Sequence, residues 1–171
     1  MNLNELANLG EFIGGIAVIA TLIYLAIQLR QNTRALKSAT LANNTSLWSA
    51  MLVSIADGDK SKAYLHGSIG SDEIEPGEFL QFFLLSRALF VGFENQHHQF
   101  NQGMLDKSIY DGYERSFQDQ ILSMPGFRRY WKQCQHEFSP QFQGRVKEML
   151  KGIPEVDPNR LMKQWRILAE G

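Results

Sequence analysis

Residues 12–29 read FIGGIAVIATLIYLAIQL and contain no charged side chain. At a rise of 1.5 Å per residue, a helix of this length covers about 27 Å, close to the thickness of the hydrocarbon core of a bilayer. The preceding residues 1–11 hold two glutamates and no basic side chain, whereas a secretory signal begins with lysine or arginine. The stretch therefore predicts an uncleaved transmembrane helix. A buried core helix is the alternative, because four residues make the stretch less apolar: Gly14, Gly15, Thr21 and Gln28.

Basic residues follow this stretch directly. Arg30, Arg34 and Lys37 come after it, and no basic residue precedes it. Because the cytoplasmic flanks of membrane helices carry an excess of lysine and arginine, the pattern predicts that the tail 1–11 lies outside and residues 30–171 lie in the cytoplasm. The single cysteine, Cys134, agrees with a reducing compartment, since a lone thiol cannot form an internal disulfide.

The first helix is expected to continue beyond the bilayer. After Ile16 no proline or glycine occurs until Asp57-Gly58, which is a natural C-terminal stop. Residues 30–56 are therefore predicted to form a cytoplasmic extension of the transmembrane helix.

One face of this helix carries small or polar residues at alternating spacings of three and four. Lipid tails are as apolar as leucine, so membrane helices associate through close backbone approach and shared hydrogen bonds. The 3.5-residue repeat predicts a left-handed seam between copies of the chain. Chance composition and packing against the chain's own domain are the alternatives. The predicted oligomer or pore face comprises Gly10, Gly14, Ala17, Thr21, Tyr24, Gln28, Gln31, Ala35 and Ser38, and it continues through Ala42, Thr45 and Ser49.

Residues 57–171 are predicted to form a helical cytoplasmic domain. No stretch alternates between apolar and polar residues as a strand does, and prolines stand at the expected first turns of several helices. The fold class is therefore all-α, with one N-terminal transmembrane helix extended into a long cytoplasmic helix and followed by a bundle of about five helices. The expected elements are a helix over 59–66, a surface loop over 66–78, and helices over 76–102, 106–123, 126–137, 139–151 and 157–169.

The helix over 76–102 contains an arginine in its most apolar part. Residues 79–93 read FLQFFLLSRALFVGF, which is apolar on nearly every face and indicates a buried central helix. A re-entrant or membrane-leaning helix is the alternative. A buried guanidinium needs a carboxylate or carbonyl partner. We expect Arg87 to form a buried ion pair, with Glu94 two turns away as the candidate partner and Glu114 or Asp111 as partners from the next helix. A ligand-binding arginine is the alternative.

The sequence contains no pattern that is typical of catalysis. The best metal candidates are Glu94, His97 and His98, but adjacent histidines point about 100° apart on a helix, so we expect no metal site. Cys134 and His136 also fall on different faces, and there is no phosphate-binding glycine loop or paired-cysteine motif. We therefore predict no catalytic residue, no cofactor and no enzymatic activity.

Charge is unevenly distributed along the chain. Although the formal net charge is −1, residues 57–119 hold eleven acidic and five basic residues, whereas residues 120–171 hold five acidic and nine basic residues. Such asymmetry would suit contact of the basic part with anionic lipid or with the acidic part of a neighbouring copy, and a solvated mixed surface is the alternative. The near-neutral balance argues against a nucleic-acid partner.

Three segments carry a resemblance to known sequences. They are IYLAIQLRQNTRALKSAT (23–40) after GEFIGGIAVIATL (10–22), then ENQHHQFNQGMLD (94–106), and MPGFRRYWKQCQHEFSPQF (124–142). Together they make the chain similar to a large group of bacterial proteins of unknown function with one N-terminal membrane helix and a helical cytoplasmic domain. The resemblance implies the bacterial inner membrane and supplies no catalytic residue.

These observations predict a single-pass membrane protein that acts as a self-associating scaffold or accessory protein. Its expected partners are membrane lipid, further copies of itself and a larger membrane complex. One alternative is a homo-oligomeric ion channel, in which Thr21, Gln28 and Gln31 would line the pore. The other is a ligand sensor with a pocket between helices near Arg87.

Overall fold

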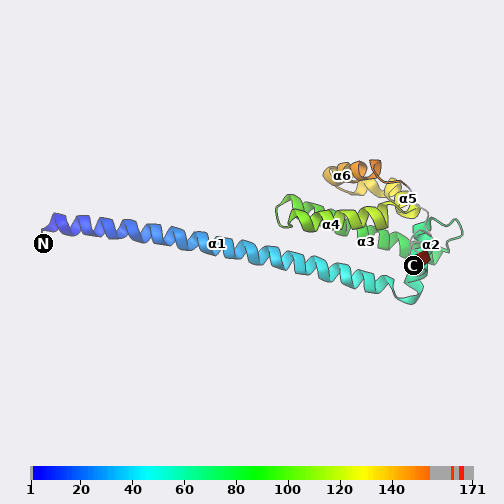
Figure 1. The fold of residues 1–171 in the computed structure, drawn as a ribbon, viewed down its shortest axis with the longest axis horizontal. Coiled ribbons are helices and arrows are strands. Elements are labelled where there is room, and N and C mark those ends of the chain that lie inside the picture. Colours follow the sequence, from blue (N-terminus) through cyan, green and yellow to red (C-terminus); the bar gives the residue numbers. More distant parts are fainter. Residues whose placement is uncertain (1, 155–162, 164–165, 168–171) are drawn as a thin grey trace. The chain divides into compact units, whose positions relative to one another are not determined.

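A computed structural model describes residues 2–154, 163, 166 and 167 of the chain, and the described residues form α-helices with no strand. The predicted all-α class is confirmed. The chain divides into two units, Met1–Ala42 and Asn43–Gly171. Helix α1 (Leu3–Ile55) begins in the first unit and ends in the second (Figure 1). The helix predicted over 157–169 lies almost wholly outside the described residues.

Helix α1 is one unbroken helix of 53 residues and ends just before Asp57-Gly58, as predicted. Every residue from Leu3 to Leu36 is exposed, and the most apolar eighteen-residue window is 0% buried. The helix is therefore long and apolar enough to cross a membrane. Its last part differs, because Asn44 is buried within the second unit.

Helix α2 (Gly58–Ile69) is longer than the sequence predicted. It ends at Gly70, whose φ of 70° is left-handed, and the amides of Gly70 and Ser71 donate to the carbonyls of Gly67 and His66. The surface loop predicted over 66–78 is therefore wrong in its first part, since Gly67 and Ser68 are helical and buried. Small residues are typical of a turn, whereas here they serve close packing between helices.

Three of the later helices begin where the prolines predicted. Pro76, Pro125 and Pro140 each stand in a first helical turn, where the missing amide hydrogen costs nothing. The Ser139 hydroxyl also accepts a hydrogen bond from the amide of Phe142. A π-helical turn, which the sequence did not predict, follows α4. The elements are α3 (Pro76–Asn101), α4 (Lys107–Phe117), η1 (Gln118–Leu122), α5 (Pro125–Cys134), η2 (Gln135–Glu137) and α6 (Pro140–Lys151).

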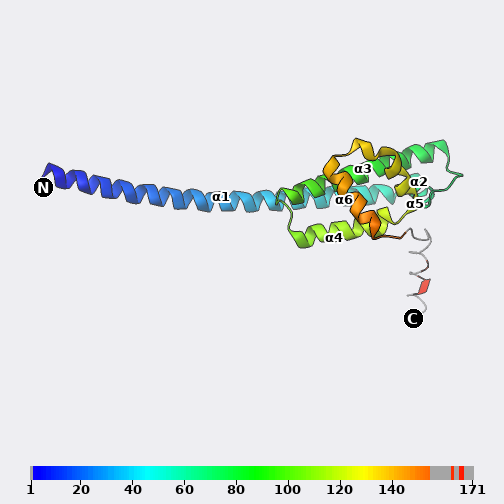
Figure 2. The same ribbon diagram turned by 90° about the horizontal axis from the view of Figure 1, so that it is seen from above.

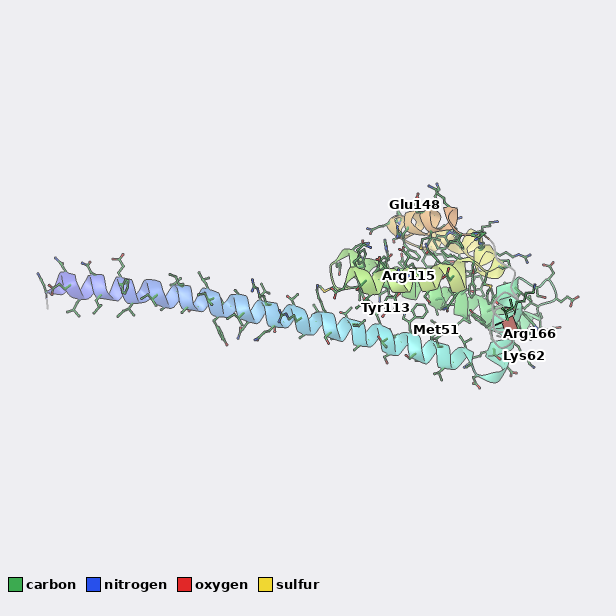
Figure 3. The ribbon with its side chains drawn as sticks, in the orientation of Figure 1. Met51, Lys62, Tyr113, Arg115, Glu148 and Arg166 are labelled. Atoms are coloured by element: carbon green, nitrogen blue, oxygen red, sulfur yellow. The ribbon has the colours of Figure 1, made fainter. Side chains whose placement is uncertain are left out.

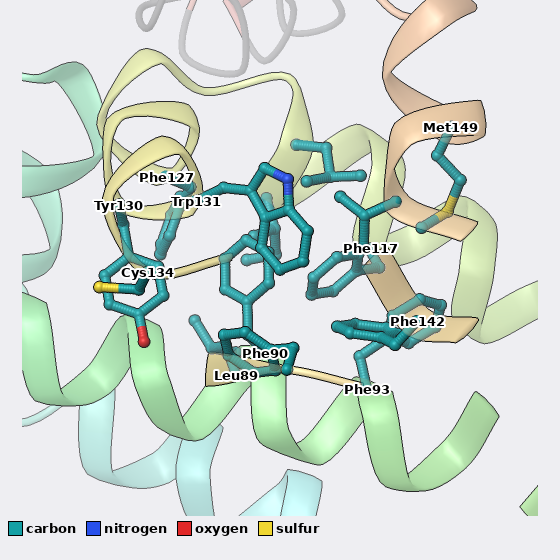
Figure 4. Packing of buried hydrophobic residues seen from close by; sticks show 14 of the residues in the cluster. Leu89, Phe90, Phe93, Phe117, Phe127, Tyr130, Trp131, Cys134, Phe142 and Met149 are labelled. Atoms are coloured by element: carbon teal, nitrogen blue, oxygen red, sulfur yellow. The ribbon is translucent and has the colours of Figure 1, made fainter. Parts of the chain in front are cut away.

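Helix α3 runs through the second unit and contacts α2, α4 and α5 (Figure 2). Phe90 and Phe93 are fully buried and project from α3 toward α5 and α6 (Figure 4). Phe90 stacks on Trp131 with ring centroids 5.2 Å apart, and Phe93 stacks on Phe117 at 4.2 Å. Offset stacking of this kind adds about 0.5–1.5 kcal/mol per pair beyond area burial. The core is thus an aromatic cluster built on one face of α3.

Two glycines allow α2 and α5 to meet at backbone distance. A Cβ atom on Gly126 would overlap the carbonyl oxygen of Gly67, and one on Gly67 would overlap the ring of Phe82. The end of α2 and the start of α5 therefore depend on glycine for steric reasons.

We predict that Gly126→Ala destabilises the chain by about 1–3 kcal/mol or more, because the new methyl group meets a backbone carbonyl that cannot rotate away. The matched control is Gly144→Ala in α6, where a Cβ would meet nothing within 4 Å. That change should stabilise by about 0.4–1 kcal/mol through the unfolded state. Thermal unfolding of the full chain in detergent measures both, and equal midpoints for the two variants would contradict the close approach.

Candidate functional site

The predicted oligomer face of α1 is exposed in the first unit. Every member from Gly10 to Ser38 is exposed, and a Cβ added at Gly10, Gly14 or Gly15 would meet nothing within 4 Å. Packing among the described residues therefore does not require glycine at these positions.

Two polar side chains of this face form hydrogen bonds within the helix. The Thr21 hydroxyl donates to the Ala17 carbonyl at 2.8 Å, and the Gln28 amide donates to the Tyr24 hydroxyl at 2.5 Å. Local bonds of this type lower the cost of placing polar groups in lipid without a second helix. The Thr21 hydroxyl is therefore satisfied within its own helix, and the Gln28 amide is satisfied in part.

A different face of α1 contacts the helical domain. Asn44, Trp48, Met51 and Ile55 are buried or half-buried at spacings of four, three and four, and the Asn44 amide donates to Gln99 Oε1 at 2.6 Å. Thr45 and Ser49 of the small-residue stripe are exposed. The contact with the helical domain is thus centred on the face of α1 that carries Asn44, Trp48 and Met51.

The buried ion pair predicted between Arg87 and Glu94 is wrong. Arg87 is at the surface, with 49% of its side chain exposed, and pairs with Glu137 of η2. Glu94 accepts a hydrogen bond from the amide of Ser139 at 2.8 Å. The reason is that α3 is not buried on all sides: it exposes apolar residues along the same side as Arg87, namely Leu80, Leu84 and Val91.

The two adjacent histidines point in different directions, as the 100° spacing predicted. His97 is buried, with Nδ1 2.7 Å from the Tyr110 hydroxyl, whereas His98 is exposed and contacts the Gln102 amide. Across residues 2–154, no three His, Cys, Asp or Glu side chains are grouped so that they could hold a metal ion. Cys134 is buried in the hydrophobic cluster, beside Tyr130 in Figure 4.

His97 belongs to a polar network that joins α3, α4 and α6. Burial lowers the pKa of His97 and raises the pKa of Tyr110 to about 12. At neutral pH the Tyr110 hydroxyl therefore donates to an uncharged imidazole. Beside them, Arg145 Nε donates to Glu114 Oε1 at 2.5 Å. Sequence analysis missed this cluster because its members lie on three helices.

A cavity of about 210 Å³ lies between the end of α1 and helices α2, α3 and α4. In Figure 3 the labels Met51 and Tyr113 mark α1 and α4, two of the helices that enclose the cavity. Arg87 does not line this cavity, so it is not the pocket expected near Arg87. We call this cavity of about 210 Å³ the Gln96 groove. Its lining residues are Trp48, Leu52, Ile55, Tyr64, Leu89, Gln96, Tyr113, Ser116, Phe117, Gln120 and Ile121.

The sequence matches no protein-family model, and comparisons with curated proteins and with solved structures found no match. The resemblance to bacterial membrane proteins of unknown function thus stays a prediction.

The ion pairs Arg87–Glu137 and Arg145–Glu114 should differ in their effect on stability, because only the first is at the surface. Arg87→Leu removes an exposed pair and should change the free energy of unfolding by no more than about 1 kcal/mol. Arg145→Leu leaves Glu114, with 12% of its side chain exposed, without its guanidinium, and should cost about 1–3 kcal/mol. Urea titration of the full chain in detergent compares them. A larger loss of unfolding free energy for Arg87→Leu than for Arg145→Leu would contradict the surface position of Arg87.

Proposed function

We propose that the chain is a single-pass protein of the bacterial inner membrane that self-associates through α1 and serves as a scaffold or accessory protein. Residues 12–29 span the bilayer, and the helical domain lies in the cytoplasm, where it binds other molecules. This proposal assigns no catalytic role to any residue.

The main support is the apolar window of α1, which is 0% buried although its side chains are almost all hydrophobic. Exposing such a surface to water would cost about 25 cal/mol for each Å², whereas a lipid environment removes that cost. The second unit has its own aromatic core, so it does not require these side chains for folding.

The basic residues Arg30, Arg34 and Lys37 support the orientation. They lie on exposed or half-exposed positions of α1 directly after the apolar window, and the tail before it has no basic residue. Such an arrangement is typical of a helix whose C-terminal end faces the cytoplasm.

The exposed glycines support self-association. Helices in a bilayer gain little from apolar contact alone, so they associate where small residues let their backbones approach. Gly10, Gly14 and Ala17 provide such a surface, and no contact within the described part of the chain accounts for it. The channel alternative is less favoured, because Thr21 and Gln28 form local hydrogen bonds.

We predict that a cysteine introduced near Asn2 is labelled by a membrane-impermeant thiol reagent in intact cells, since the N-terminus lies outside. A cysteine in place of Lys151, at the exposed end of α6, should be labelled only after permeabilisation. Both variants would carry Cys134→Ser so that each chain has one thiol. The reverse labelling pattern would overturn the proposed orientation.

We also predict that Gly14→Leu with Ala17→Leu shifts the chain to smaller species in membrane crosslinking, because the added side chains block close approach while helix length and insertion are kept. The control, Gly15→Leu with Ala26→Leu, adds comparable volume on another face of α1 and should leave the distribution unchanged. An unchanged distribution in the first variant would remove the support for self-association. A closed ring of four or more wild-type copies that conducts ions would favour the channel.

A further inference from the structure

The Gln96 groove contains a buried amide that the fold does not use. Gln96 is 1% exposed, and among the residues that the structure describes neither its Nε2 nor its Oε1 has a hydrogen-bond partner. An unpaired buried polar atom loses its hydrogen bonds to water without replacement, so native proteins rarely leave both atoms of one amide unmatched. Gln96 lines the cavity, and because neither amide atom is accessible to solvent, a turn of the side chain toward the cavity would let a ligand there supply both missing bonds.

The rest of the lining indicates what such a ligand would be. None of the described residues that line the groove is charged, so a charged group would lose its hydration without gaining a counter-charge. Four aromatic side chains surround the space and would contact a flat ring through their faces or edges. They are Trp48, Tyr64, Tyr113 and Phe117.

The size of the cavity limits the ligand further. An apolar cavity of about 150 Å³ accepts benzene, so about 210 Å³ accommodates one ring with a short substituent. The Gln96 amide has an N–H donor and a carbonyl acceptor side by side. A matching ligand group would place a carbonyl opposite that N–H and an N–H opposite that carbonyl.

We propose that the Gln96 groove binds a small uncharged ring compound that carries a carbonyl and an N–H side by side, as in an aromatic carboxamide or a lactam. The ring packs among the aromatic side chains, and the amide edge pairs with Gln96. The groove belongs wholly to the second unit, so the proposal does not rest on membrane insertion or on self-association.

The probe is benzamide, titrated calorimetrically into the full chain in detergent micelles. Wild type should bind benzamide at least about tenfold more tightly than N,N-dimethylbenzamide, which lacks the N–H, or benzoate, which carries a charge. This comparison uses wild-type protein only, so it remains decisive if a variant fails to fold. Equal binding of the three compounds would overturn the proposal.

The variant Gln96→Met keeps the length of the side chain and removes both polar atoms. It should weaken benzamide binding at least about tenfold, leave toluene binding intact, and raise the thermal midpoint, because the two unpaired amide atoms of Gln96 are removed. Gln133→Met, on the exposed side of α5 and outside the groove, is the matched control and should change neither quantity. A lowered midpoint for Gln96→Met would assign Gln96 a structural role and overturn the proposal.

Discussion

The second unit depends on the face of α3 that carries Phe90 and Phe93. Each later helix contributes a ring to that face: Phe117 from α4, Trp131 from α5 and Phe142 from α6. Rings are large and rigid, so contact with a common face fixes both the distance and the rotation of each helix. Short helices of ten to twelve residues, which are marginal alone in water, are held in place by this shared contact.

The apolar residues of the chain belong to two separate environments. Most of the buried ones of the second unit form one cluster, although Leu80, Leu84 and Val91 of α3 remain exposed. Those of residues 12–29 are exposed on all sides of α1. Polar groups follow the same division. In the second unit His97 of α3 and Tyr110 of α4 pair with each other across helices, while Thr21 and Gln28 find partners within about one turn of their own helix.

Local constraints made most helix boundaries predictable. Pro76, Pro125 and Pro140 fix φ at their own positions, so a first turn can be recognised without knowing the fold. Contacts between helices could not be recognised in this way. The partner of Arg87 lies fifty residues away at Glu137, in a short 3₁₀ turn that no periodicity indicates. Gln96 likewise stands in ENQHHQF beside two histidines, and only the three-dimensional arrangement shows that its amide lacks a partner among the described residues.

Helix α1 is continuous in its backbone, yet its residues belong to two different units. Asn44, Trp48 and Met51 belong with the helical domain, and Trp48 approaches Gly92 of α3. A soluble fragment that begins at the Asp57-Gly58 stop would omit these residues and expose the side of α3 and α4 that they cover. A fragment that begins shortly before Asn43 keeps them. The place to cut the chain is therefore inside a helix rather than at the turn that follows it.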